Sequence, residues 1–219
     1  MTSEKRDTVF DYRALRLLIG IIALSLPFVV SIVASKPLTS ISASYYTEAR
    51  DEFVGMLFIV GAFLWAYNGF STKQARASKA ASVAAIFVAL FPTVCQISEP
   101  GCNVAGPGIT STIHFTAAAV LFLILAGFCF MPFRFDTKGQ GGKKGVRSRI
   151  YFVCGSVMLA SIAVIVVAKL FVDNQIVEEL RIVYWSEATA LCAYGVAWIV
   201  AGKYFNFLTD PEEKLKLIE

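Results

Sequence analysis

The sequence predicts an all-α integral membrane protein, a bundle of six transmembrane helices with both chain ends in the cytoplasm. Of its 219 residues, 57% are hydrophobic and 16% are charged, whereas soluble domains average about 45–50% apolar and about 25% charged residues. The apolar residues are also clustered, in stretches close to the ~20 residues that a helix needs to cross a bilayer. We therefore expect a single transmembrane domain over residues 1–219.

Six apolar stretches are long enough to be candidate spans. They are apolar on all sides, whereas the strands of a membrane barrel alternate apolar and polar positions over about ten residues. The third stretch is the shortest, and Pro92 near its end makes its boundary uncertain. The predicted spans are 17–34, 53–70, 80–94, 113–131, 150–172 and 183–201.

The basic residues orient these spans, because Lys and Arg near span ends are retained on the cytoplasmic side. Sixteen of the 20 Lys and Arg residues lie in the two termini, in the second-to-third connection or in the fourth-to-fifth connection. The other four are Lys36, Arg50, Lys169 and Arg181. Every connection fits strict alternation, which predicts that the N- and C-termini are both cytoplasmic.

The first span has a second interpretation as a cleaved signal peptide. Lys5 and Arg6 would form its basic region, and Val33-Ala34-Ser35 resembles a small-residue cleavage site. The apolar run is longer than usual for a signal peptide, which favours a retained helix. Cleavage would leave the orientation of the other spans unchanged. The net charge of +4 does not indicate nucleic-acid binding, because no polar domain carries a basic surface that would fit a groove.

The five cysteines divide between the two sides of the predicted membrane. Cys95 and Cys102 lie at or in the outer connection that follows the third span. Disulfides form in oxidising compartments, so a Cys95–Cys102 disulfide is the natural hypothesis, with two unlinked thiols as the alternative. A metal site built on this pair is disfavoured, because the chain has no CxxC spacing and one histidine, His114.

Unusual polar residues gather at the predicted outer ends of spans two, four and six. Ionisable residues inside or beside a span are costly, which makes them functional candidates. Glu187 stands out because it lies about one turn into an apolar helix, on a stripe with Ala190 and Tyr194 that we expect to face protein. An outward-opening polar pocket is therefore predicted, with the candidates Tyr45, Tyr46, Arg50, Asp51, His114, Tyr184, Glu187 and Tyr194.

Simpler roles are open for most of these residues. The tyrosines are typical of anchors at the membrane–water interface, and Arg50 with Asp51 or Glu48 would form a surface ion pair of little energetic consequence. His114 has an alternative role as a residue that caps a helix or hydrogen-bonds a loop. Small residues on the helix faces favour close packing, including the formation of a homo-oligomer.

The polar cluster admits two classes of chemistry. One histidine and several carboxylates suit a small polar ligand, a cation or a proton relay. They also suit an enzyme that acts on lipids or headgroups at the outer leaflet, with His114 and either Glu187 or Asp51 as acid and base. Ser44 or Ser111 beside His114 would be a nucleophile, although no nucleophile-elbow motif surrounds either. A single histidine excludes three-histidine hydrolases and bis-histidine haem proteins, and we expect no cofactor.

Three short motifs carry a family resemblance. Arg50-Asp51-Glu52-Phe53-Val54-Gly55, Ala89-Leu90-Phe91-Pro92-Thr93 and Ile113-His114-Phe115 resemble those of small bacterial six-span membrane proteins without an established activity. The resemblance implies a multi-pass protein of the bacterial inner membrane, in contact with membrane lipids. We expect a small transporter, channel or solute-binding protein, with the lipid-acting enzyme and a sensory or assembly subunit as alternatives.

Overall fold

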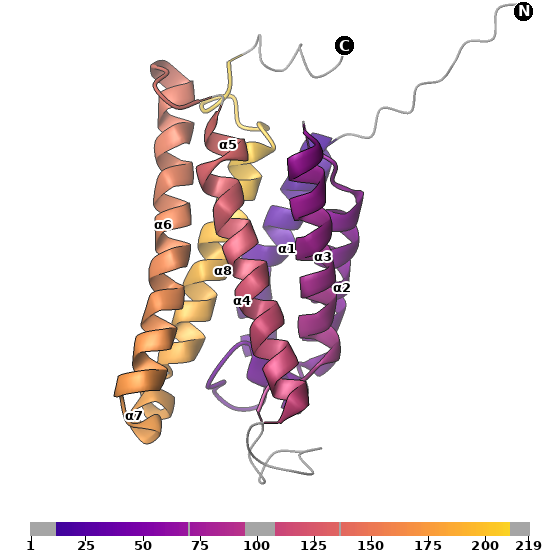
Figure 1. Cartoon of the computed structure of the whole chain (residues 1–219), viewed down its shortest axis with the longest axis vertical. Coiled ribbons are helices and arrows are strands. Elements are labelled where there is room, and N and C mark those ends of the chain that lie inside the picture. Colours follow the sequence, from indigo (N-terminus) through magenta and orange to yellow (C-terminus); the bar gives the residue numbers. More distant parts are fainter. Residues whose placement is uncertain (1–11, 70, 95–107, 136, 211–219) are drawn as a thin grey trace, which may run out of the picture.

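The computed structural model describes residues 12–69, 71–94, 108–135 and 137–210, and every regular element in these ranges is helical. Long helices run up and down beside one another (Figure 1). They are α1 (Tyr12–Val33), α2 (Arg50–Ala66), α3 (Thr72–Leu90), α4 (Ile109–Phe130), α6 (Gly142–Phe171) and α8 (Ile182–Ala201). Three short helices join them, namely η1 (Ser42–Tyr46), α5 (Pro132–Phe135) and α7 (Asn174–Glu179). The predicted all-α class is confirmed.

Each predicted span corresponds to one long helix, although some boundaries differ. The largest differences are at the starts of α3 and α6, which begin at Thr72 and Gly142 rather than at residues 80 and 150. In α3 the cause is visible at the start of the helix. The Ser71 hydroxyl caps this helix by accepting a hydrogen bond from the Gln74 N–H at 3.2 Å, an arrangement that satisfies one of the free N–H groups of a helix start. The helix ends at Leu90, before Pro92, because the residue preceding a proline is pushed out of the helical region.

Three of these helices, rather than the predicted six, are long and apolar enough to cross a membrane. They are α1, α4 with its extension to Arg134, and α6. The other three fall short for physical reasons that differ. The α2 helix has 17 residues, and the first half of α3 carries Lys73, Arg76 and Lys79. The α8 helix contains Glu187 among several polar residues. The structure thus suggests a membrane protein and supports three candidate spans directly.

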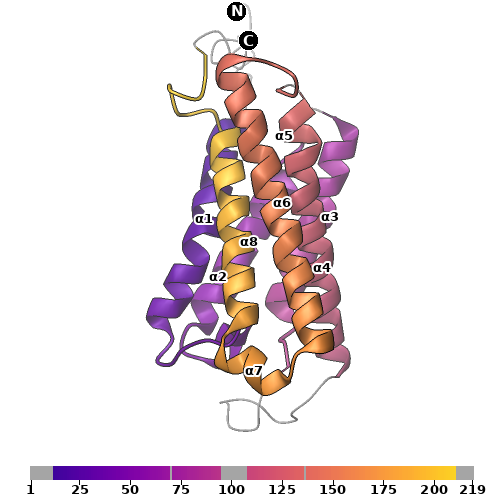
Figure 2. The same ribbon diagram turned by 90° about the vertical axis from the view of Figure 1, so that its left-hand side faces the viewer.

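The most extensive helix–helix contact is between α1 and α8, which lie side by side, with α6 on the other flank of α8 (Figure 2). Two glycines make the approach of α1 and α8 possible. A Cβ atom added at Gly20 would lie 2.7 Å from the Gly195 carbonyl oxygen, and one added at Gly195 would lie 2.7 Å from that of Gly20. Backbone therefore touches backbone at this crossing, as in helix pairs that associate through small residues.

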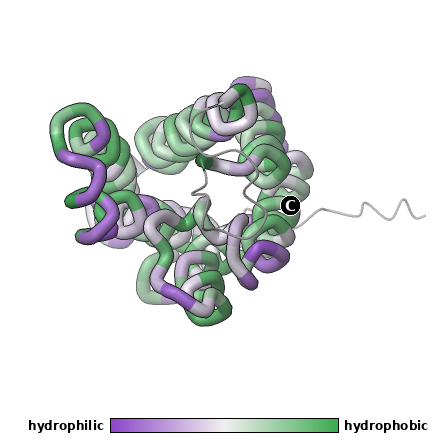
Figure 3. Tube along the Cα trace, turned by 90° about the horizontal axis from the view of Figure 1, so that it is seen from below, coloured by the Kyte–Doolittle hydropathy of each residue, from purple (hydrophilic) through white to green (hydrophobic). Residues whose placement is uncertain are grey.

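Seen from below, the helices consist mostly of hydrophobic residues, with a few separate hydrophilic stretches (Figure 3). Large apolar side chains are exposed on several helices, among them Phe28 at 58%, Leu123 at 53% and Val153 at 56%. Exposed large apolar side chains on so many helices are costly in water and suit a lipid environment.

Candidate functional site

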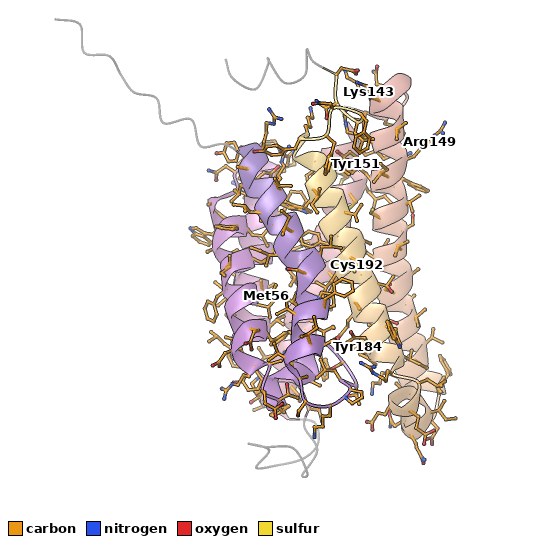
Figure 4. The ribbon with its side chains drawn as sticks, turned by 180° about the vertical axis from the view of Figure 1, so that it is seen from behind. Met56, Lys143, Arg149, Tyr151, Tyr184 and Cys192 are labelled. Atoms are coloured by element: carbon orange, nitrogen blue, oxygen red, sulfur yellow. The ribbon has the colours of Figure 1, made fainter. Side chains whose placement is uncertain are left out.

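The connection between α1 and α2 crosses one end of the bundle, which we call the outer end, and α8 holds it there. The backbone N–H of Tyr184 donates to the Thr39 carbonyl at 3.1 Å, and Arg181 Nε donates to the Leu38 carbonyl at 2.7 Å. Tyr184 lies at the end of the bundle opposite Lys143 and Arg149 (Figure 4). The connection after α1 and the start of α8, which are far apart in the sequence, are thereby bonded to each other at this end of the bundle.

Glu187 is the main side-chain anchor of this connection. It is half-buried one turn into α8, and its Oε2 accepts a hydrogen bond from the Ile41 N–H at 2.6 Å. Ile41 immediately precedes η1. The Glu187 carboxylate therefore acts like a helix-capping acceptor, although it belongs to another helix. The bond fixes the start of η1, where Ser42 lies.

His114 connects three segments at the same end. It is 1% exposed. Its Nδ1 lies 2.7 Å from the Phe91 carbonyl oxygen, and its Nε2 lies 3.0 Å from Ser42 Oγ. A carbonyl oxygen only accepts, so we assign the ring proton to Nδ1. In the neutral ring Nε2 is then an acceptor for the Ser42 hydroxyl.

Ser42 and His114 have the arrangement of a nucleophile and its base. In such pairs the base lies within about 2.6–3.2 Å of the nucleophile and a third group orients the base. Here the third group is the Phe91 carbonyl, and Ser42 is 8% exposed. Glu187 does not contact the imidazole in this network but holds the backbone before Ser42.

The serines singled out from the sequence have other partners. The Ser44 hydroxyl donates to the Ile41 carbonyl at 2.6 Å. Ser111 Oγ accepts from the Gly108 N–H at 2.9 Å and donates to its carbonyl at 3.0 Å. Both bonds are local, so both serines cap or close turns. Ser42 was not predicted as a site residue, because it lies in a connection. A connection has no helical or strand periodicity from which to infer which of several neighbouring serines points toward the histidine.

Of the predicted pocket residues, four belong to this outer network. Besides His114 and Glu187, the Tyr46 hydroxyl donates to the Thr93 carbonyl at 2.8 Å, and the Tyr184 hydroxyl lies 2.6 Å from Ser31 Oγ. Each bond joins segments that are far apart in the sequence. The network therefore reaches from the end of α1 to the start of α8.

Three predicted residues lie on the surface beside the network. The Arg50 guanidinium stacks 4.4 Å from the centre of the Tyr45 ring and donates to its hydroxyl at 3.0 Å. Asp51 is exposed in the first turn of α2, where the helix dipole favours a negative charge. The carboxyl of Glu48 accepts from the N–H and the hydroxyl of Ser35. Donors of this kind, first among them its own backbone N–H, hold the pKa of Glu48 below its ordinary value.

Tyr194 lies away from the outer end, in an aromatic cluster. Its side chain is 1% exposed, and its ring centre is 5.6 Å from that of Trp198. Trp198 in turn contacts Tyr67, Phe128 and Phe133. The Tyr194 hydroxyl and Trp198 Nε1 are buried and find no hydrogen-bond partner in the part of the chain that the structure describes. The structure therefore does not bring Tyr194 together with His114 and Glu187.

A second polar cluster lies at the opposite end of the bundle, which we call the basic end. Arg16 is 5% exposed and donates to the Ala201 carbonyl at 3.0 Å and to the Tyr67 hydroxyl at 2.7 Å. Arg147 is fully buried and donates to the Leu208 carbonyl. A pocket of about 40 Å³, large enough for about one water molecule, lies between these side chains. From the sequence, both arginines were interpreted only as signals of membrane topology. No periodic pattern shows that a basic residue near the end of a helix points into the bundle.

Two further predictions concern metals and disulfides. Among the described residues, no group of three or more His, Cys, Asp and Glu side chains is placed to hold a metal ion. Cys95 and Cys102 lie outside the described residues, so their disulfide stays a prediction.

Comparison with known proteins adds no relative. No protein-family model matches the chain, and neither a curated protein nor a solved structure matches it. The resemblance to small bacterial six-span membrane proteins therefore stays a prediction.

Proposed function

We propose that the chain is a six-span protein of the bacterial inner membrane with the basic end in the cytoplasm. The long helices run alternately up and down, so that α1 begins and α8 ends at the basic end (Figure 1). Lys143 and Arg149 lie there (Figure 4), in keeping with the retention of positive charge on the cytoplasmic side. Half of the α8 residues are buried by neighbouring helices, and a helix shielded by protein needs less apolar surface than one surrounded by lipid.

This topology predicts which sites a membrane-impermeant maleimide reaches in intact cells. In a variant whose native cysteines are replaced by serine, Lys36→Cys and Asp173→Cys are expected to react from outside. Lys138→Cys is expected to react only after permeabilisation. All three positions are exposed and lie in connections. Labelling of Lys138→Cys in intact cells, with protection of Lys36→Cys, would show the opposite orientation.

For the function, we propose a membrane-embedded serine enzyme that acts on ester bonds at the outer leaflet. The hydrogen bond between Ser42 Oγ and His114 Nε2 is the observation that carries this proposal. The neutral imidazole would take the Ser42 proton as the oxygen attacks a carbonyl carbon, and would return it to the leaving alcohol oxygen. Water would then release the acyl group from Ser42 by the reverse proton path. Glu187 would act as a positioning residue through Ile41.

A fluorophosphonate probe with a short alkyl chain tests this function without knowledge of the substrate. It is expected to label the reconstituted wild-type protein at Ser42, because only a serine activated by a base attacks the phosphorus atom. Ser42→Ala and His114→Gln should abolish labelling. Thr39→Ala is the matched control in the same connection, because the Thr39 side chain is exposed, and it should be labelled like the wild type. Labelled peptides, identified by mass spectrometry, that do not contain Ser42 would contradict the proposal, as would an unlabelled wild type.

The transport or solute-binding function remains the second candidate, favoured by the position of His114 and Glu187 in one polar network. Such a network provides groups that exchange protons or bind a small polar ligand. An unlabelled wild type that nevertheless carries solute or proton flux into vesicles would favour this candidate, provided that the flux is lost when His114 and Glu187 are both replaced.

A further inference from the structure

An apolar groove runs between α3 and α4 on the side of the bundle. It has a volume of about 370 Å³. Its lining includes Val83, Ala84 and Phe87 from α3 and Ile113, Ala117 and Val120 from α4. Small side chains form its floor, since Ala84 and Ala117 are buried, whereas Val83, Phe87 and Val120 are between 42% and 43% exposed at its rim. The groove is thus open sideways, toward the surroundings of the bundle.

Two threonines also line the groove, and their hydroxyl groups are used within the helix. Thr112 Oγ1 donates to the Gly108 carbonyl at 2.9 Å, and Thr116 Oγ1 donates to the Thr112 carbonyl at 2.8 Å. Each hydroxyl thus bonds to the carbonyl four residues earlier, which satisfies it without an outside partner. A polar ligand would therefore gain few hydrogen bonds in this groove. An apolar chain would leave contact with water, or would replace another lipid chain, without removing any polar group from its hydrogen-bond partner.

The groove begins next to the segments that carry and hold the proposed base, His114. Ile113, which lines its outer part, is the residue before His114. On α3, the ring of Phe87 packs 5.5 Å from that of Phe91, whose carbonyl holds the imidazole. From Thr112 to Val120 the groove extends along nine residues of α4, about 12 Å at the rise of an α-helix. That length is most of one leaflet, since the hydrocarbon core of both leaflets together measures about 30 Å.

We infer that the groove binds one acyl chain of an outer-leaflet lipid, whose ester group would then lie at the level of Ser42 and His114. This inference rests on the proposed function and names its substrate class as a lipid carboxylic ester. The hydrolysis conserves all atoms: the bond between the acyl carbon and the alcohol oxygen breaks, and water supplies the hydroxyl of the fatty acid and the proton of the released alcohol.

The test is photocrosslinking in phosphatidylcholine vesicles that contain a trace of phospholipid with a diazirine halfway along one acyl chain. In the full wild-type chain, we expect adducts to concentrate on the groove residues of α3 and α4. Thr116→Trp should reduce these adducts several-fold, because the indole fills the groove from its exposed rim. Val164→Trp, at an apolar surface position of α6 that is 48% exposed, is the matched control and should leave them unchanged.

The outcomes separate this inference from the proposed function. Adducts spread evenly over the lipid-facing sides of all helices, or groove adducts unaffected by Thr116→Trp, would overturn the acyl-chain site. Fluorophosphonate labelling of Ser42 in the wild-type chain tests the enzyme separately, because the short probe does not need the groove. An unlabelled wild type with adducts concentrated in the groove would instead refute the enzyme and leave a lipid-binding groove.

Discussion

Alanine in place of Gly195 is expected to destabilise the protein strongly, because the added methyl group meets backbone rather than a movable side chain. The new Cβ would lie 2.7 Å from the Gly20 carbonyl oxygen and 2.9 Å from the Leu24 nitrogen. No rotamer change relieves such a contact, so α1 and α8 would have to separate. Overpacking of this kind costs about 1–3 kcal/mol, and occasionally more. Gly20→Ala should have a similar effect, since its Cβ would meet the Gly195 oxygen.

Thermal unfolding in detergent measures this effect, and the chain offers a matched control. Gly55 lies in the middle of α2, and an added Cβ meets nothing within 4 Å. Gly55→Ala should therefore be neutral or stabilising, because alanine is favoured over glycine inside a helix by about 1 kcal/mol. Equal melting temperatures for Gly195→Ala and the wild type would show that the two helices are not in backbone contact.

Methionine in place of Arg16 is expected to destabilise the basic end strongly. The substitution removes the donors to the Ala201 carbonyl and the Tyr67 hydroxyl. It also removes a cation that lies 5.2 Å from the Tyr67 ring centre and 5.7 Å from that of Phe133. Buried polar groups that lose their partner cost about 1–3 kcal/mol each, so the loss of both partners is expected to cost roughly 2–6 kcal/mol.

Arg13→Met provides the comparison for this change. Arg13 is also in the first turns of α1 and donates to the carbonyls of Gly202 and Lys203, but it is only half-buried. Water can replace much of its interaction, so we expect a loss of stability well below that of Arg16→Met in the same unfolding experiment. Equal losses would show that burial does not distinguish the two arginines.

The helices were predictable from the sequence because each one is determined mainly by the apolar residues within its own segment. A helix that faces lipid or other helices is apolar on all sides, and that property appears as a long run without charged residues, such as Ile150 to Ala168. Boundaries were less predictable where a helix continues into polar sequence, as α3 does through Arg76 and Lys79. Six spans were predicted, but length and apolarity support three. Partly polar helices such as α8 resemble a membrane span only in their apolar half.

The candidate site was predictable in part. His114 and Glu187 stood out because ionisable residues are rare in apolar helices, and the structure places both in one network. The position of Ser42 depends on how the connection after α1 folds across the bundle, which no local pattern encodes. Tyr194 shares a helical stripe with Glu187, but it lies two turns deeper, where it packs against Trp198.

The hydrogen bonds of the outer end also set an order for its assembly. Ile41 and Glu187, which form one of these bonds, are 146 residues apart in the sequence. Ser42 and His114, which form another, are 72 residues apart. A chain emerging from the ribosome has neither partner when η1 is made. The connection after α1 therefore takes its final shape only once α4 and then α8 are in place, so that synthesis of the last helix completes a structure begun by the first.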